Sequence, residues 1–128
     1  MDIIRTIMKV SPEKQKEVLQ TLISLIEPLG KKNGCLSYGI YCDIEDKNIF
    51  NLISEWDNRQ HLDDYMMSGR FSVLLGIKSL LCKPIEITIL TVLNCEGIEA
   101  VNDVRKKIKL IYPVLIPVLM KIQKPIEC

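Results

Sequence analysis

The chain has 128 residues, of which 48% are hydrophobic and 26% are charged, and its 17 basic and 16 acidic side chains leave a net charge of +1. A chain of this length can bury the core of one domain without disulfides or metals. Because the charge is nearly balanced, no overall field attracts a polyanion or an acidic membrane, and nucleic-acid binding is disfavoured.

The cysteine and histidine contents exclude further classes of protein. The five cysteines form no Cys-x-x-Cys pair, and the chain has one histidine. This pattern excludes a disulfide framework, a zinc ribbon and a histidine-rich metal site. The first residues alternate like a strand and lack the basic start and long apolar stretch of a signal peptide. We therefore expect a cytoplasmic protein.

The first elements in chain order are a strand and a helix. Residues 3–10 alternate and predict the strand, and Ser11-Pro12-Glu13 supplies an N-cap, a first-turn proline and an acid that predict a helix start. The helix is expected to stop near Pro28, with Gly30 or Gly34 providing the positive φ that turns the chain. One apolar stripe, typical of a helix that covers a sheet, consists of Val18, Leu22, Leu25, Ile26 and Leu29.

A β-hairpin is predicted next. Residues 33–43 and 48–56 are two runs of strand length, rich in aromatic and β-branched residues and joined by a short polar turn. Trp56, the only tryptophan, ends the second run and is followed by the helix-start signal Asp57-Asn58. A large aromatic at this position stands at the rim between sheet, loop and helix, where small-molecule pockets commonly form.

Two helices and a strand complete the pattern. Residues 58–68 and 70–82 predict short helices separated by Gly69, and residues 85–93 alternate like a final strand. Core positions on the second helix are expected to be Phe71, Leu74, Leu75, Leu81 and Cys82. The order is β-α-β-β-α-β, which predicts an α+β, ferredoxin-like fold with a split β-α-β arrangement and a four-stranded antiparallel sheet.

Both faces of the predicted sheet carry apolar residues. Phe50 and Leu52 alternate with Ile49 and Ile53, and the last strand shows the same pattern. A sheet with one wet face would alternate more cleanly, so a second copy of the chain is expected to cover the other face. At about 25 cal/mol per Å², several hundred Å² of apolar area would contribute on the order of 10 kcal/mol before association costs. We therefore predict a homodimer.

The C-terminal part is expected to be an appendage. Residues 97–110 show apolar residues at helical spacing, and the uncharged run 110–120 contains Pro113 and Pro117. A spanning helix needs about 20 apolar residues, so this run predicts no membrane span. The expected division is a ferredoxin-like domain, residues 1–95, and a helical appendage with a proline-broken apolar tail, residues 96–128.

Several short patterns, in order and spacing, resemble the antibiotic biosynthesis monooxygenase domain. They cover roughly residues 3–94 and consist of Pro12-x5-Val18, Pro28, Asn33-Gly34-Cys35-Leu36-Ser37-Tyr38, Phe50-x5-Trp56 and Ser68-Gly69-Arg70-Phe71. The resemblance implies a dimeric α/β barrel, with a pocket between each sheet and its own helices. In monooxygenase members it also implies oxygen chemistry without flavin or metal, so no cofactor is expected. A deprotonated phenol or quinol in a dry pocket can itself pass an electron to O₂.

The resemblance also suggests site residues. Trp56 matches the family's strand-end tryptophan, which would stack on a flat substrate; a packing role is the alternative. Many members carry a histidine nine residues later, where this chain has Tyr65. This departure weakens any mechanism that needs imidazole as a base or haem ligand there. Relatives that use an asparagine four residues before the tryptophan have Leu52 at that position here, and Asn51 is expected on the opposite face.

The residues add candidates of their own. His61 lies four residues before Tyr65, on the same helix face, and the two would be the catalytic proton acceptor and its hydrogen-bonded orienting partner; an exposed histidine beside Asp57 is the alternative. Arg70 would hold an anionic oxygen or be solvated. The expected substrate-binding residues are Trp56, Arg70, Phe71 and Tyr38.

Three functions remain. The first is a cofactor-independent monooxygenase that acts on a quinol or similar aromatic molecule with O₂. The second is a homodimer that binds a small molecule without catalysis. Haem binding or degradation is disfavoured because Tyr65 occupies the ligand position.

The cysteines of the predicted hairpin are not expected to react. Buried, inert thiols are expected for Cys35 and Cys42, since no basic partner is visible in the sequence.

Overall fold

The computed structural model describes residues 1–26 and 33–111, with side chains to residue 107. The expectations for Pro28, Leu29 and Gly30, and those for the apolar run beyond residue 111, lie outside the described residues. The chain divides into two compact units, Met1–Leu93 and Asn94–Cys128.

The first unit is built on one antiparallel sheet. Its strands are β1 (Asp2–Lys9), β2 (Cys35–Cys42), β3 (Ile49–Trp56) and β4 (Glu86–Thr91), in the spatial order β2-β3-β1-β4. Because β1 pairs with both β3 and β4, the two β-α-β halves interlock at the centre of the sheet. The predicted ferredoxin-like fold is confirmed, with β4 shorter than the sequence suggests.

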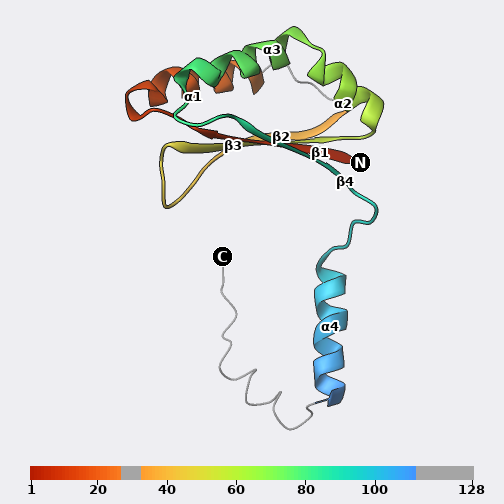
Figure 1. Cartoon of the computed structure of the whole chain (residues 1–128). Helices are drawn as coiled ribbons and strands as arrows, with labels where there is room; N and C mark the ends of the chain where they lie inside the picture. The colour runs from red at the N-terminus through yellow and green to blue at the C-terminus, as the bar shows by residue number, and fades with distance from the viewer. Residues whose placement is uncertain (27–32, 112–128) are drawn as a thin grey trace. The chain divides into compact units, whose positions relative to one another are not determined.

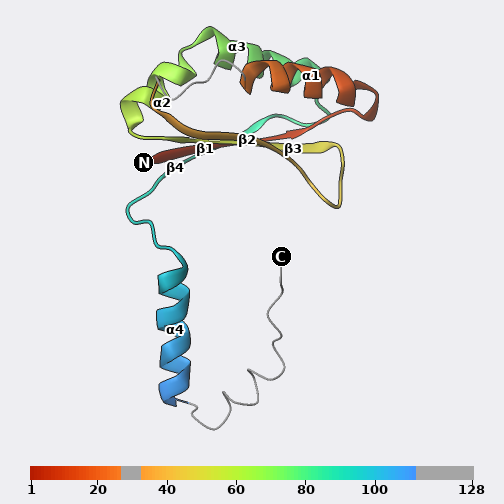
Figure 2. The ribbon, with the colours of Figure 1, turned by 180° about the vertical axis from the view of Figure 1, so that it is seen from behind.

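The helices that the structure describes in this unit all lie on one face of the sheet. They are α1 (Gln15–Ile26), α2 (Arg59–Met66) and α3 (Gly69–Gly76), followed by the 3-10 turn η3 (Ile77–Leu80). Figure 1 shows them above the strands, and Figure 2 shows the same layering from behind. The even-numbered residues of β1 and β3, with the buried stripe of α1, form the core: Ile4, Met8, Val18, Leu22, Phe50, Leu52 and Trp56.

The opposite face of the sheet carries the other half of the alternation. Ile3, Ile7 and Ile53 project there and are partly exposed, and Leu90 of β4 is 46% exposed. Asn51 lies on this face as expected, since it alternates with the buried Phe50 and Leu52. No other element of described residues 1–26 and 33–93 covers this face (Figure 1).

Ser11 is the N-cap of the 3-10 turn η1 (Pro12–Lys14), with Pro12 and Glu13 in the first turn as expected, and η1 leads into α1. The Ser11 side chain makes no capping hydrogen bond, and its Oγ lies 3.5 Å from Cys82 Sγ. Two other local expectations were wrong. Leu75 and Cys82 are exposed rather than in the core: Leu75 lies on the solvent side of α3, next to the buried Leu74, and Cys82 follows the end of η3. Cys42, expected to be buried, is exposed at the edge strand, whereas Cys35 is buried.

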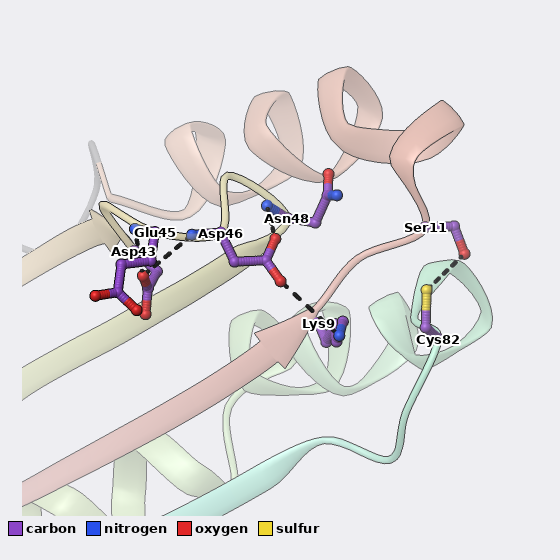
Figure 3. Close-up of polar contacts among 7 residues, drawn as sticks. All are labelled: Lys9, Ser11, Asp43, Glu45, Asp46, Asn48 and Cys82. Atoms are coloured by element: carbon purple, nitrogen blue, oxygen red, sulfur yellow. Dashed lines mark hydrogen bonds and ion pairs between the residues drawn. The ribbon is translucent and has the colours of Figure 1, made fainter.

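The turn that joins β2 to β3 is held by side-chain oxygens. Asp43 Oδ1 accepts hydrogen bonds from the backbone N–H groups of Glu45 and Asp46, at 2.7 and 3.2 Å (Figure 3). Asp46 accepts one from the N–H of Asn48 at 3.0 Å and lies 3.8 Å from Lys9 Nζ. These contacts fix the register of the hairpin at the end of β3 remote from Trp56.

The second unit contains helix α4 (Ile98–Ile111), close to the helix predicted for residues 97–110. Asp103 and Lys106 form an ion pair of 4.0 Å on this helix. Among the helices of the described residues, none has the length and apolar character needed to cross a membrane.

Candidate functional site

The end of β3 carries a buried aromatic cluster. Trp56 is 1% exposed, and its indole Nε1 donates a hydrogen bond of 2.9 Å to Ser54 Oγ. Ser54 lies two residues earlier on the same strand and therefore faces the same side of the sheet. With the indole N–H satisfied and the ring covered, Trp56 is part of the core in this structure.

Tyr65 of α2 joins Trp56 to α3. Its ring stacks on the indole with centroids 4.8 Å apart and planes at 26°. On its other side, Phe71 of α3 meets the Tyr65 ring edge-to-face, with centroids 5.4 Å apart. Offset stacking and edge-to-face contacts are the preferred geometries of aromatic pairs. The three rings form one rigid wall contributed by a strand and two helices.

Two polar atoms beside this wall are buried without an ordinary hydrogen bond. Tyr38 Oη, from β2, and Arg70 Nη1, from α3, make no hydrogen bond of ordinary length among the described residues, although the hydroxyls of Tyr38 and Tyr65 are close enough to shift each other's pKa. Arg70 also makes no ion pair in the described part of the chain, although its charge acts on the hydroxyls of Tyr38 and Tyr65. A buried donor left unpaired costs about 1–3 kcal/mol, so such atoms mark places where a ligand or water is expected.

A β-bulge brings β2 into this arrangement. Cys35 pairs with Trp56 and Ser37 with Glu55, so Leu36 is the extra residue and points outward. Without the bulge, Cys35 and Tyr38 would face opposite sides of the sheet. With it, both face the helices, and Cys35 is close enough to raise the pKa of Tyr38 and of Tyr65.

Burial decides the protonation state of the cluster. Desolvation raises the pKa of Tyr65 and of Tyr38 above the ordinary value for a tyrosine, and the Arg70 guanidinium only partly offsets this effect. Desolvation also raises the pKa of the Cys35 thiol. All three groups are therefore protonated at neutral pH. Tyr38 and Tyr65 can donate hydrogen bonds there but cannot serve as bases.

His61 belongs to a different pair at the start of α2. Its Nδ1 lies 2.5 Å from Asp57 Oδ1, and both side chains are partly exposed. Hydrogen bonding to His61 lowers the pKa of Asp57. Gly34, with φ +79°, lies beneath the pair, and a Cβ at Gly34 would overlap the imidazole. Asn58 caps the helix by accepting the His61 N–H at 2.9 Å.

The structure thus groups most of the candidates. Trp56, Tyr65, Phe71, Tyr38 and Arg70 converge from β2, β3, α2 and α3, whereas His61 pairs with Asp57 and makes no hydrogen bond to Tyr65 within the described residues. Sequence reasoning missed the hydrogen bond between Ser54 and Trp56, although Ser54 lies at i−2 from Trp56 and so faces the same side of the strand. The positive φ of Gly34 and the position of His61 beside Asp57, which the sequence offered as an alternative, are confirmed.

Metal ligands do not group in this way. In the part of the chain that the structure describes, no set of three or more His, Cys, Asp or Glu side chains is placed to hold a metal ion.

Comparison with known proteins gives one curated relative. A protein of Synechocystis sp., described as uncharacterised, is 35% identical over 83 residues, which are 64% of this chain and 56% of that protein. The chain therefore matches only a little more than half the length of this relative.

Solved structures share the fold. A conserved protein from Methanosarcina mazei is 31% identical, with a TM-score of 0.65 over 70% of this chain and 89% of that one. A protein from Mycobacterium tuberculosis gives a TM-score of 0.67 at 21% identity, over 75% of this chain and 98% of that one. At that identity the likeness shows the fold alone. Residues 1–74 match the family described as antibiotic biosynthesis monooxygenase. Since the match spans more than half of the chain, the chain belongs to the antibiotic biosynthesis monooxygenase family.

Proposed function

We propose that this protein is a cofactor-independent monooxygenase that acts on a quinol or a similar electron-rich aromatic molecule. The observation that carries the proposal is a pair of buried atoms, Tyr38 Oη and Arg70 Nη1, that make no hydrogen bond of ordinary length within the described residues and lie beside the aromatic wall of Trp56, Tyr65 and Phe71. A flat molecule with an acidic hydroxyl has the two features that this cluster complements. Family membership supports the same reaction class.

The chemistry needs few side chains. In the simplest case a naphthol and O₂ give a naphthoquinone and water: one oxygen atom becomes the new carbonyl, and the other leaves as water with the two hydrogens removed from the substrate. O₂ is the only oxidant. The protein must bind the phenol, exclude water and stabilise the anion that donates the electron.

Each candidate residue then has a role. Arg70 and Tyr38 bind the phenolic oxygen, and Tyr65 donates a hydrogen bond because burial keeps its hydroxyl protonated. Trp56 and Phe71 hold the Tyr65 ring in place and form the apolar side of the site. His61, oriented by Asp57 through Nδ1, leaves Nε2 to accept the substrate proton.

The test is oxygen uptake with a panel of hydroquinones and naphthols, with product identified by mass spectrometry. Tyr65→Phe and His61→Gln should each lower the rate about 10²-fold or more if both groups act in proton transfer and anion stabilisation. Gln60→Ala, on an exposed position of the same helix, is the matched control and should retain the parent rate. A folded protein that consumes no oxygen with any member of the panel would refute the proposal.

We also propose that the active form is a homodimer in which the open sheet faces meet. The apolar residues Ile3, Ile7, Ile53 and Leu90 support this arrangement, because they leave an apolar surface on the face away from the helices. Light scattering in dilute solution should give twice the monomer mass. Ile53→Lys, at the centre of the face, should shift the protein to monomer, whereas Ile44→Lys, in the exposed turn, should not. A stable monomer of the parent protein would refute the proposed dimer.

The second candidate is a small-molecule-binding homodimer without catalysis. It is favoured by the complete burial of Trp56, whose ring is already stacked on Tyr65 and is therefore not a free platform for a substrate. In that case the purified protein should retain a bound molecule that stays unchanged in air. Haem binding is disfavoured by Tyr65, and an unchanged Soret band on haemin titration would exclude it.

A further inference from the structure

We propose that helix α4 and the apolar run that follows it, residues 110–120, attach this protein to the surface of a membrane that contains anionic lipids. The protein lies on the lipid surface and does not cross it. The proposal concerns the second unit alone and does not depend on the function proposed for the first. The part of the run beyond residue 111 is outside the described residues and enters only through its sequence.

The apolar side chains of α4 are exposed. Ile98, Val101 and Val104 are 68%, 51% and 58% exposed, and the last two form a stripe at helical spacing. Within residues 98–107, whose side chains the structure describes, none is buried. A helix of 14 residues is marginal in water when nothing packs against it, because packing of an apolar face supplies most helical stability in proteins. We therefore expect a further apolar surface to cover the stripe.

The charged residues of α4 are ordered around the stripe. With 3.6 residues per turn, Arg105 and Lys107 border it, one on each side. Glu99 and Asp103 lie on the opposite side of the helix, where Asp103 pairs with Lys106 at 4.0 Å. Long basic side chains can cover apolar surface with their stems while the charged head reaches the polar layer. An apolar stripe with basic borders is typical of helices that lie in the interface of an anionic membrane.

The distribution of charge along the chain favours the same partner. Residues 105–124 contain six basic side chains and no acidic one. The rest of the chain therefore has 11 of the 17 basic residues and all 16 acidic ones. The nearly neutral net charge thus results from two regions of opposite sign. Anionic headgroups attract the C-terminal region although they do not attract the chain as a whole.

The apolar run extends the surface that α4 presents. Residues 110–120 carry no charge, and Lys109 and Lys121 flank them. An apolar run of about 10–14 residues is too short to span a bilayer and is typical of an interfacial segment or a buried core helix. Pro113 and Pro117 disfavour the core helix, since proline removes a backbone donor and breaks the helix interior. The interfacial segment is the alternative that this sequence retains.

A second copy of α4 fits the stripe less well than a lipid surface. Two paired stripes would bring the basic residues that border them, Arg105 and Lys107, close to those of the other copy. The carboxylates that could neutralise these charges, Glu99 and Asp103, lie on the far side of each helix. Helix pairs instead use opposite charges at the borders of their apolar seam.

The experiment is co-sedimentation of the full chain with lipid vesicles. One set of vesicles contains phosphatidylcholine and phosphatidylglycerol in a ratio of about two to one, and the control set contains phosphatidylcholine alone. We expect at least tenfold tighter binding to the anionic vesicles, since each basic residue near an anionic surface contributes about fivefold in affinity. Raising the salt concentration to about 0.5 M should remove most of this difference, because salt screens the attraction.

A charge variant assigns the effect to the basic residues. The combination of Arg105→Gln, Lys107→Gln and Lys109→Gln should weaken binding to the anionic vesicles about 100-fold. The matched control removes the same charge from exposed positions of the first unit and should keep the parent affinity; it combines Lys16→Gln, Lys78→Gln and Lys83→Gln. Equal losses in the two triple variants would contradict a role for the position of the charges.

An apolar variant tests the stripe itself. Val101→Asn combined with Val104→Asn should weaken binding to the anionic vesicles about tenfold or more, because less apolar area leaves water. Val101→Leu combined with Val104→Leu keeps the stripe apolar and should bind at least as tightly as the parent protein. Circular dichroism shows whether each variant folds.

Three outcomes would overturn the proposal. The first is a folded parent protein that does not sediment with the anionic vesicles. The second is equal binding to the anionic and neutral vesicles, because lipid charge would then not be recognised. The third is a lower mass of the lipid-free protein, measured by light scattering, after Val101→Asn with Val104→Asn; this result would assign the stripe to a second copy. Oxygen uptake tests the first unit separately, so neither experiment decides the other.

Discussion

The two ends of strand β3 differ in the burial and the hydrogen bonding of the polar groups around them. At the turn end, Asp43 and Asp46 accept hydrogen bonds from the backbone, and the groups involved are at or near the surface (Figure 3). At the Trp56 end, Tyr38 Oη and Arg70 Nη1 are buried and make no hydrogen bond of ordinary length within the described residues. The hydrogen bonds at the turn end fix the register of the hairpin. At the Trp56 end, polar atoms that could bind a ligand lie beside the aromatic wall. The contrast teaches that unsatisfied burial, rather than the presence of charged residues, locates the candidate site.

The largest expected effect is a loss of stability when the aromatic cluster at the end of β3 is disrupted. Trp56→Ala removes a side chain that is 1% exposed and should lower the free energy of unfolding by about 3–5 kcal/mol, because it leaves a cavity beneath Tyr65. This loss is measured by urea unfolding followed by circular dichroism. Tryptophan fluorescence cannot be used, because the variant lacks the chain's only tryptophan. Leu36→Ala, at the exposed bulge, is the control. A loss below about 1 kcal/mol would mean that Trp56 does not anchor the core.

The second effect concerns the backbone under the His61–Asp57 pair. Gly34→Ala places a Cβ at a positive φ and against the imidazole, so it should lower the free energy of unfolding by about 2 kcal/mol or more. Gly69→Ala is the control, because a Cβ there meets no atom within 4 Å. Equal stability of the two variants in thermal unfolding would contradict the close packing at Gly34.

The third effect is a pH dependence. The pKa of Tyr65 is raised in the folded state, so its contribution to stability is complete below the unfolded pKa, near 10.0, and is lost as pH rises toward the folded value. In that window the free energy of unfolding should fall by about 1.4 kcal/mol per pH unit for each such group. Tyr65→Phe should reduce this slope, measured by urea unfolding between about pH 9 and pH 11.

Tyr41→Phe is the matched control for this slope, since Tyr41 is 57% exposed on the other face of the sheet. A slope that Tyr65→Phe leaves at the parent value would show that Tyr65 ionises as readily in the folded protein as in the unfolded one.

The smallest effect is at the turn end. Asp43→Ala removes two backbone hydrogen bonds from a partly exposed turn and should cost about 1 kcal/mol or less. Lys9→Met removes an ion pair that is partly exposed and should cost about 0.5 kcal/mol or less. Neither variant should alter ligand binding at the Trp56 end. A change in affinity from either one would show that the two ends are coupled.

The sequence determined the fold of the first unit. Alternation in residues 3–10 and in the hairpin, together with the stripe of Val18, Leu22 and Leu25, predicted which residues face the core. These patterns are local, since a strand repeats every two residues and a helix every 3.6, and both periods can be read from the chain itself. By the same period, Tyr38 and Tyr41 lie on opposite faces of β2, opposite Ser54 and Asn51 respectively.

Only the tertiary structure decided the composition of the candidate site. Tyr38, Tyr65 and Arg70 come from β2, α2 and α3, and their meeting depends on a bulge at Leu36 and on how two short helices cross the sheet. No local period encodes such a convergence. The stacking of Trp56 on Tyr65 likewise follows from packing between distant segments, as does the burial of two polar atoms that make no hydrogen bond of ordinary length in the described part of the chain. The free energy of such contacts depends on neighbours that the local sequence does not specify.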